Sequence, residues 1–174
     1  MKSVSFIVAH NSSFDRKFVE ARLPDAAGLA WCCSLNQIDW RQRGMGNTSL
    51  GYLLHECGYY HEGHRALSDV DALIQVLRHR SADGTTALSE LIDRGSTPAW
   101  KIDAVGAPFD VKNDLKERKY RWNAVERCWS LEVADEIALE IERVWLGEYV
   151  YSDGKGARAP GPTISQITAH TRFT

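Results

Sequence analysis

The sequence of 174 residues lacks an apolar run long enough to cross a membrane, which takes about 18 consecutive residues. Its first residues, from Met1 to Val8, are too few and end too polar to form a secretory signal. We therefore expect a cytoplasmic protein that has no membrane partner.

Cysteine is scarce, and a surplus of positive charge is absent. The four cysteines include an adjacent pair, Cys32 and Cys33, which does not match the ligand spacing of a zinc knuckle. We therefore expect buried thiols and no structural zinc. The net charge of −2 disfavours a protein that coats nucleic acid, because such proteins are normally basic. It is compatible with an enzyme that holds a short single strand.

The sequence does contain the apolar patterns of an α/β domain. Residues 5–9 form a continuous apolar run, which is typical of a strand buried on both faces. Apolar side chains then recur at helical spacing from Phe14 to Ala21. A second strand is expected at 30–38, and further helices are expected at 49–57 and 66–80. We take residues 1–82 as one α/β domain.

The pattern changes at residues 81–84, where we place a domain boundary. We expect a linker helix in residues 83–98 and a small α+β module in residues 99–174. Within the module we expect strands at 100–105 and 163–173, a hairpin of 120–123 with 128–133, and helices at 110–119 and 135–147.

Two polar clusters lie where helices are expected to begin. The first runs from His10 to Asp15, after the buried strand, and the second runs from His64 to Asp69, before the long helix. Functional groups of α/β proteins gather at the carboxyl ends of strands and at neighbouring helix N-termini. Taken singly, each carboxylate could also be an ordinary first-turn acid, and His64 an ordinary loop histidine.

Together the two clusters match a pair of motifs. Residues 11–15 fit the pattern N-x-x-F-D, and residues 64–69 fit H-x-A-x-x-D. In these motifs the sequence resembles the DnaQ-like (DEDDh) 3′–5′ exonucleases, the family of the DNA polymerase III proofreading subunit and RNase T. The resemblance covers residues 4 to about 80. It implies an RNase H-like fold and a phosphodiester hydrolase that uses two Mg²⁺ or Mn²⁺ ions.

The resemblance also implies a role for each motif residue. Asp69 would bind a metal directly, Asp15 would bind the second metal through water, and His64 would be the general base. Phe14 would pack beneath the site and orient Asp15. Asn11 would fix the turn between strand and helix, and it is a further candidate for contact with nucleic acid.

The sequence departs from the family at its first motif, an Asp-x-Glu on the first strand. Only ten residues precede Asn11, and none is acidic. We therefore expect a partial RNase H-like exonuclease fold, truncated at its N-terminus, that lacks its first three strands. Such a chain should be impaired alone, because metal affinity falls with ligand charge. A homodimer or a companion chain that supplies the missing strands would cover the open sheet edge.

The segment from residue 100 onward resembles a small module that follows the nuclease domain in some bacterial DnaQ-like exonucleases. Its basic residues alternate with aromatic ones, as in a stacking platform for single-stranded nucleic acid. The candidates are Lys116, Lys119, Arg121 and Trp122. Alternatively, the tryptophans form the core of a small domain, and the basic residues lie on a solvated face.

The expected function is therefore a metal-dependent 3′–5′ exonuclease that acts on the ends of single-stranded DNA or RNA. The motifs do not discriminate between the two nucleic acids. The alternative is a catalytically inactive, nuclease-like module that binds nucleic acid or protein.

Overall fold

The computed structural model describes residues 6–60 and 66–173. The chain is a mixed α/β protein that forms two compact units. Unit 1 consists of residues 1–97 and 168–174, and unit 2 consists of residues 98–167. We describe each unit by itself.

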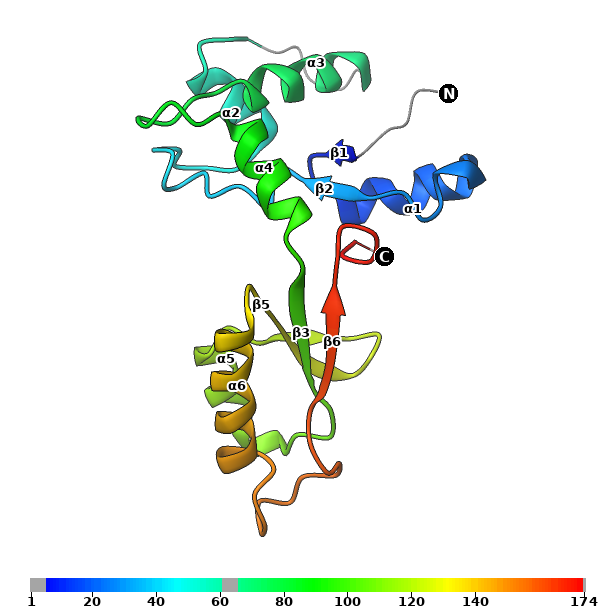
Figure 1. Ribbon diagram of the computed structural model, residues 1–174, viewed down its shortest axis with the longest axis vertical. Coiled ribbons are helices and arrows are strands. Elements are labelled where there is room, and N and C mark those ends of the chain that lie inside the picture. Colours follow the sequence, from blue (N-terminus) through cyan, green and yellow to red (C-terminus); the bar gives the residue numbers. More distant parts are fainter. Residues whose placement is uncertain (1–5, 61–65, 174) are drawn as a thin grey trace. The chain divides into compact units, whose positions relative to one another are not determined.

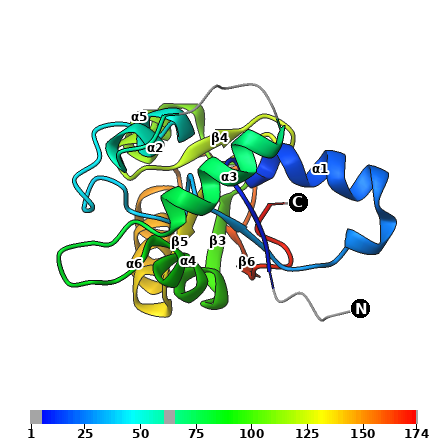
Figure 2. The same ribbon diagram turned by 90° about the horizontal axis from the view of Figure 1, so that it is seen from above.

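Unit 1 is built on two parallel strands, β1 (Ile7–Ala9) and β2 (Trp31–Cys33). Helix α1 (Ser12–Arg22) and the short helix η1 (Pro24–Ala26) connect them. Helix α1 lies on one side of the strands and α4 (Ala87–Ser96) on the other (Figure 1 and Figure 2). Side chains of β1 accordingly reach two cores, Ile7 and Ala9 on the α1 side and Val8 on the α4 side. The continuous apolar pattern of this strand reflects that double coverage.

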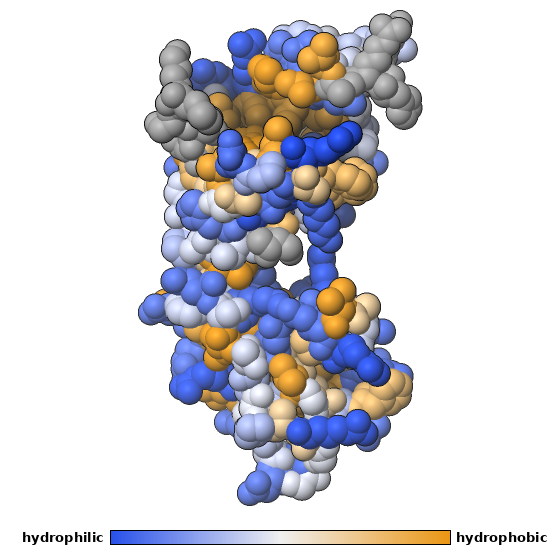
Figure 3. Space-filling view, turned by 90° about the vertical axis from the view of Figure 1, so that its right-hand side faces the viewer, coloured by the Kyte–Doolittle hydropathy of each residue, from blue (hydrophilic) through white to orange (hydrophobic). Residues whose placement is uncertain are grey.

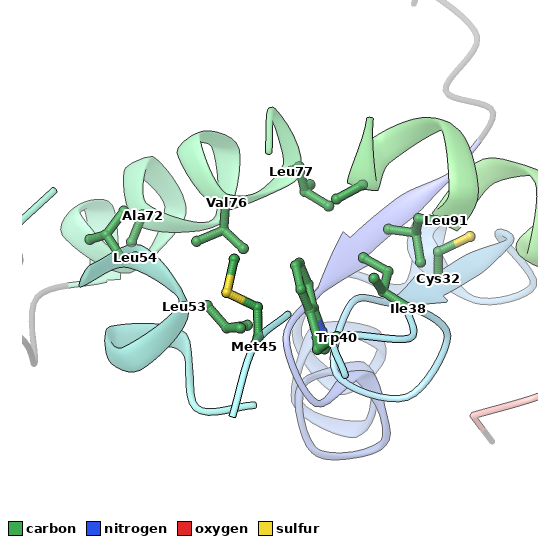
Figure 4. Close-up of a cluster of buried hydrophobic side chains, with 11 residues drawn as sticks. Cys32, Ile38, Trp40, Met45, Leu53, Leu54, Ala72, Val76, Leu77 and Leu91 are labelled. Carbon is green, nitrogen blue, oxygen red and sulfur yellow. The ribbon is translucent and has the colours of Figure 1, made fainter. Parts of the chain in front are cut away.

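The larger core of unit 1 lies between β2 and the helices α2 (Leu50–Glu56), α3 (Ala66–Leu77) and α4. Trp40, almost completely buried, stands between Met45 and Val76 on one side and Leu91 on the other (Figure 4). Its indole Nε1 donates to the carbonyl of Ser34 at 2.7 Å. This bond satisfies the one polar atom that the ring would otherwise bury unpaired.

Residues 83–98, expected as a linker helix, contain α4. Its Ala87 and Leu91 belong to the larger core of unit 1, and Gly95 lies against Cys32. The hydroxyl of Thr86 accepts a hydrogen bond from the N–H of Ser89 at 3.1 Å and thus caps the helix. The helix therefore packs as part of unit 1.

Unit 2 is an antiparallel sheet of four strands with two helices on one face. The strand order is β4 (Arg121–Asn123), β5 (Cys128–Val133), β3 (Ala99–Ala104) and β6 (Thr163–Ile167). The short helix η2 (Phe109–Val111), α5 (Lys112–Glu117) and α6 (Glu136–Tyr149) complete the unit. The buried core residues of the unit are Ile102, Ala104, Leu115, Tyr120, Leu146 and Val150.

The expected final strand at 163–173 is shorter in the structure, where β6 ends at Ile167. The chain turns at Thr168, whose carbonyl accepts hydrogen bonds from the N–H groups of Thr171 and Arg172. It then rejoins unit 1, where the N–H of Trp31 donates to the carbonyl of Ala169 at 2.8 Å and the ring of Phe173 packs in the core around Trp31. The outer edge of β2 is thus partly covered.

No helix among residues 6–60 and 66–173 combines the length and the apolar character that a membrane crossing requires.

Candidate functional site

The first motif lies at the carboxyl end of β1, where the chain turns into α1. Asn11 precedes the first residue of the helix and has a left-handed backbone, with φ 80° and ψ 52°. Asparagine tolerates this conformation better than most residues. The side-chain oxygen of Asn11 accepts from the hydroxyl of Ser13 at 3.3 Å and caps no backbone N–H of the helix. The turn directs the first residues of α1 back across the end of the strand.

His10 joins three segments at this point. Its Nε2 donates to the carbonyl of Thr48 at 2.9 Å, and its Nδ1 makes a hydrogen bond with the hydroxyl of Ser34, also at 2.9 Å. Burial lowers the pKa of His10, although the Thr48 carbonyl and the charge of Asp15 act in the opposite direction. The lowered pKa favours a neutral ring, and the two hydrogen bonds are compatible with it. His10 lies in the first polar cluster of the sequence, but neither motif includes it.

Asp15 lies in the first turn of α1 and is half-buried. Burial raises its pKa, and its own backbone N–H and the nearby His10 only partly offset this effect. A carboxylate at a helix N-terminus is ordinarily favoured in the charged form, so desolvation dominates here. A carboxyl group with a raised pKa at the end of a strand is a frequent feature of functional sites.

The second motif is described only in part. Asp69 is half-buried in the first turn of α3, three residues before the buried Ala72. His64, the expected general base, lies outside the described residues. Each described motif carboxylate therefore occupies the first turn of a helix.

Phe14 does not occupy the position that the motif implied. Phe14 is 60% exposed, and its ring centroid lies 4.9 Å from that of Phe18, which is equally exposed. The buried face of α1 carries Ser12 and Arg16 instead. Phe14 is two positions from each, about 200° around the helix, and therefore points to the opposite side. The hydroxyl of Ser12 donates to the carbonyl of Cys32 at 2.7 Å, which fixes the polar face toward β2.

The candidate nucleic-acid residues of unit 2 divide between two faces of the sheet. Trp122 on β4 pairs with Trp129 on β5, with the ring centroids 5.6 Å apart, and the ammonium of Lys116 lies 5.8 Å from the Trp129 ring centroid. Trp122 is 53% exposed. Arg121 is the adjacent strand position and therefore points to the other face, while Lys119 lies in the turn before β4 with φ 72°. The structure thus links Lys116 to Trp122 only through the ring of Trp129, and Arg121 lies apart from them.

One cluster of possible metal ligands, within the described part of the chain, was missed by the sequence analysis. The ligand atoms of Asp103, Glu126 and Cys128 lie within 4.8 Å of one another. The ammonium of Lys101 lies 3.0 Å from the carboxylate of Asp103 and 2.6 Å from that of Glu126, so it already offsets one of their two negative charges. Burial also raises the pKa of Cys128, which favours its thiol form. No sequence spacing indicates this cluster, because strand pairing assembles it.

The motif carboxylates are a less complete set. Carboxylate oxygen is the ligand type that Mg²⁺ requires. However, neither Asp15 nor Asp69 belongs to a group of three possible ligands among the described residues. Asp15 and Asp69 therefore offer the right kind of ligand atom for a divalent ion, but the described residues offer too few ligands for a two-metal centre.

Comparison of the chain with protein-family models, with curated proteins and with solved structures finds no significant match.

Proposed function

We propose that this chain is part of a DnaQ-like 3′–5′ exonuclease that acts on the ends of single-stranded nucleic acid. The two sequence motifs suggest this function, and one structural observation supports it most. That observation is the half-buried Asp15, with a raised pKa, at the carboxyl end of a parallel strand. The β1–α1–β2 unit with helices on both sides is compatible with a partial RNase H-like fold.

The proposed roles are limited to what the chain's own residues can do. Asp69 and Asp15 would hold Mg²⁺ or Mn²⁺, and such an ion supplies Lewis-acid stabilisation and a water of lowered pKa when bound. His64 would accept the proton of the attacking water. Because two carboxylates are a poor ligand set, we propose that the chain is weak or inactive alone.

The edge of β1 is the place where a further segment would join this site. The N–H of Ile7 and the carbonyl of Ala9 bond to residues beside β2. The N–H and carbonyl of Val8 point away from β2, because backbone groups of successive strand residues point to opposite sides. On that side no described strand pairs with β1. Apolar side chains surround a hollow in unit 1 on this side of the molecule (Figure 3). A companion chain or a second copy that supplies a strand would pair with these groups.

The test is digestion of an end-labelled single strand with Mn²⁺, together with direct measurement of Mn²⁺ binding. We expect slow or undetectable digestion and weak Mn²⁺ binding, which Asp15→Asn and Asp69→Asn should each reduce further. Asp71→Asn, an exposed position on the same helix as Asp69, is the matched control and should change neither. Rapid Mg²⁺-dependent digestion by the chain alone would show that the ligand set is complete. If neither Asp15→Asn nor Asp69→Asn changes Mn²⁺ binding, the two residues are not metal ligands.

A binding role without catalysis is the second candidate, and the surface of Lys116, Trp122 and Trp129 favours it. The exposed ring of Trp122 packs against Trp129, which lies near the Lys116 ammonium. Such a surface suits a stacked base, which contributes about 1–3 kcal/mol. Trp122→Ala should therefore weaken the binding of single-stranded oligonucleotides about tenfold, as measured by fluorescence anisotropy. Tyr149→Ala, an equally exposed aromatic residue on α6, should have no effect. Equal loss in the two variants would contradict a specific platform.

A further inference from the structure

Helix α6 carries an apolar stripe on its outer face. Ile137, Ile141 and Val144 are 76%, 58% and 49% exposed. They recur at i, i+4 and i+7, on the side of the helix opposite the buried Leu146 and Val150. A helix on the surface of a unit normally directs such a stripe at a neighbour. No described residue of unit 2 covers it.

The stripe borders a groove of about 380 Å³, lined by Arg118, Glu140, Ile141, Val144, Trp145 and Glu148. One wall of the groove is held rigidly. The ring of Trp145 stacks on that of Tyr149, and the guanidinium of Arg118 lies 4.5 Å from the Trp145 ring centroid. Arg118 is itself fixed by two hydrogen bonds to Glu142, at 2.6 and 3.0 Å. The groove is therefore preformed, which lowers the entropic cost of filling it.

The charge that remains at the groove is negative. Arg118 is neutralised by Glu142, and Glu140 pairs with Arg143 at 2.8 Å. Glu148 lines the groove and makes no ion pair with any residue that the structure describes. An unpaired carboxylate beside an apolar stripe disfavours anionic ligands such as nucleic acid and acidic lipid, and it favours a cationic partner.

We propose that the α6 groove binds an amphipathic helix of a partner protein, with apolar residues on one face and Lys or Arg beside them. A stripe over two turns of helix presents ridges that a second helix can fill. An extended partner would need a free strand edge, which α6 does not offer. This interaction is independent of the proposed nuclease activity.

The test measures the affinity of the full chain for a synthetic helical peptide with leucine on one face and lysine on its flanks. Fluorescence anisotropy of the labelled peptide gives the dissociation constant. Ile141→Ser with Val144→Ser should weaken binding at least tenfold, and Glu148→Lys should weaken it about fivefold. Leu67→Ser, an exposed apolar residue on α3 of unit 1, is the matched control and should leave binding unchanged. A peptide with glutamate in place of lysine should bind at least tenfold more weakly.

Three results would overturn the proposal. The first is equal binding of the lysine and glutamate peptides, and the second is binding that the stripe variants do not change. The third is self-association of the chain, or attachment to anionic vesicles, that Ile141→Ser abolishes. That result would identify a second copy or a lipid surface as the occupant. Circular dichroism of each variant ensures that a loss of binding is not a loss of folding.

Discussion

Arg43 shows how a single charged side chain can organise unit 1. Its side chain is 4% exposed, and its guanidinium contacts Glu90 at 2.7 Å. It also donates to the carbonyls of Thr85 and Thr86, at 3.2 and 3.1 Å, which hold the turn before α4. The loop that carries Arg43 and the start of α4 are therefore joined through one residue.

We predict that Arg43→Ala destabilises the protein by about 2 kcal/mol, because Glu90 then keeps only its ion pair with the more exposed Arg94, at 3.0 Å, and the carbonyls of Thr85 and Thr86 lose their donor. Urea unfolding followed by circular dichroism would measure the loss. Arg143→Ala is the control, since Arg143 and Glu140 are more than half exposed, and it should cost less than about 1 kcal/mol. Similar losses in the two variants would contradict a special role for Arg43.

Asp15 gives a prediction on pH dependence. Because the folded protein raises its pKa above the usual 3.8, the native state holds the proton more tightly than the unfolded chain. Its contribution to stability is therefore lost as the pH rises through the raised value. Asp15→Asn cannot ionise, so it should be more stable than the original protein at pH 7, and this advantage should shrink toward pH 3. Solvent screening keeps the gain within about 0.5 kcal/mol.

Urea unfolding at the two pH values would measure this difference, with Asp71→Asn as the control. A variant that is less stable than the original protein at pH 7 would show that the Asp15 carboxylate mainly stabilises α1. In that case the residue would be an ordinary first-turn acid.

At the scale of elements, the close approach of α4 to β2 depends on Gly95. A methyl group at this position would overlap the Sγ of Cys32. We predict that Gly95→Ala costs about 1–3 kcal/mol, as expected when a packed core is overfilled. Gly51→Ala, at an open position of α2, should instead stabilise by about 0.5–1 kcal/mol.

A double-mutant cycle would establish the cause. If the overlap with Cys32 is responsible, Cys32→Ala should reduce the cost of Gly95→Ala by at least about 1 kcal/mol. Additive effects of the two substitutions would place the strain elsewhere, for example in the backbone of α4.

The sequence predicted most helices and strands correctly, but it did not predict which side chains are buried. The periodic apolar residues of α6 predicted its position, and β1 was predicted as a strand buried on both faces. In contrast, the expected strand at 30–38 ends at Cys33, because the N–H of Gln37 donates to the carbonyl of Cys33 and folds the chain into turns. Ile38 lies in that loop and is buried in the core. Its apolar side chain therefore led to the prediction of a longer strand.

The candidate site was predictable only where it is local in the sequence. The position of Asp15 after β1 follows from its motif. The inward direction of Arg16, and hence the exposure of Phe14, depends on packing against β2. The bond between His10 and Thr48 joins residues 38 positions apart, so no local pattern indicates it.

At the scale of the whole molecule, we predict that the 19.6 kDa chain does not persist as a free monomer at working concentrations. The backbone groups of Val8, with which no described strand pairs, and the apolar surface of unit 1 favour pairing with another strand. Light scattering coupled to size exclusion should give a mass that rises with concentration, with slow hydrogen exchange at Val8. A constant single-chain mass with rapid exchange at Val8 would contradict the prediction.

The return of residues 168–173 to unit 1 makes unit 2 an insertion within it, and this determines the order of events during synthesis. Domains usually fold as they leave the ribosome, the N-terminal one first. Here Ala169 and Phe173, which complete the edge and the core beside Trp31, are translated only after all of unit 2. Unit 1 therefore cannot form its last contacts until the end of synthesis. Unit 2 can complete its folding earlier, before unit 1.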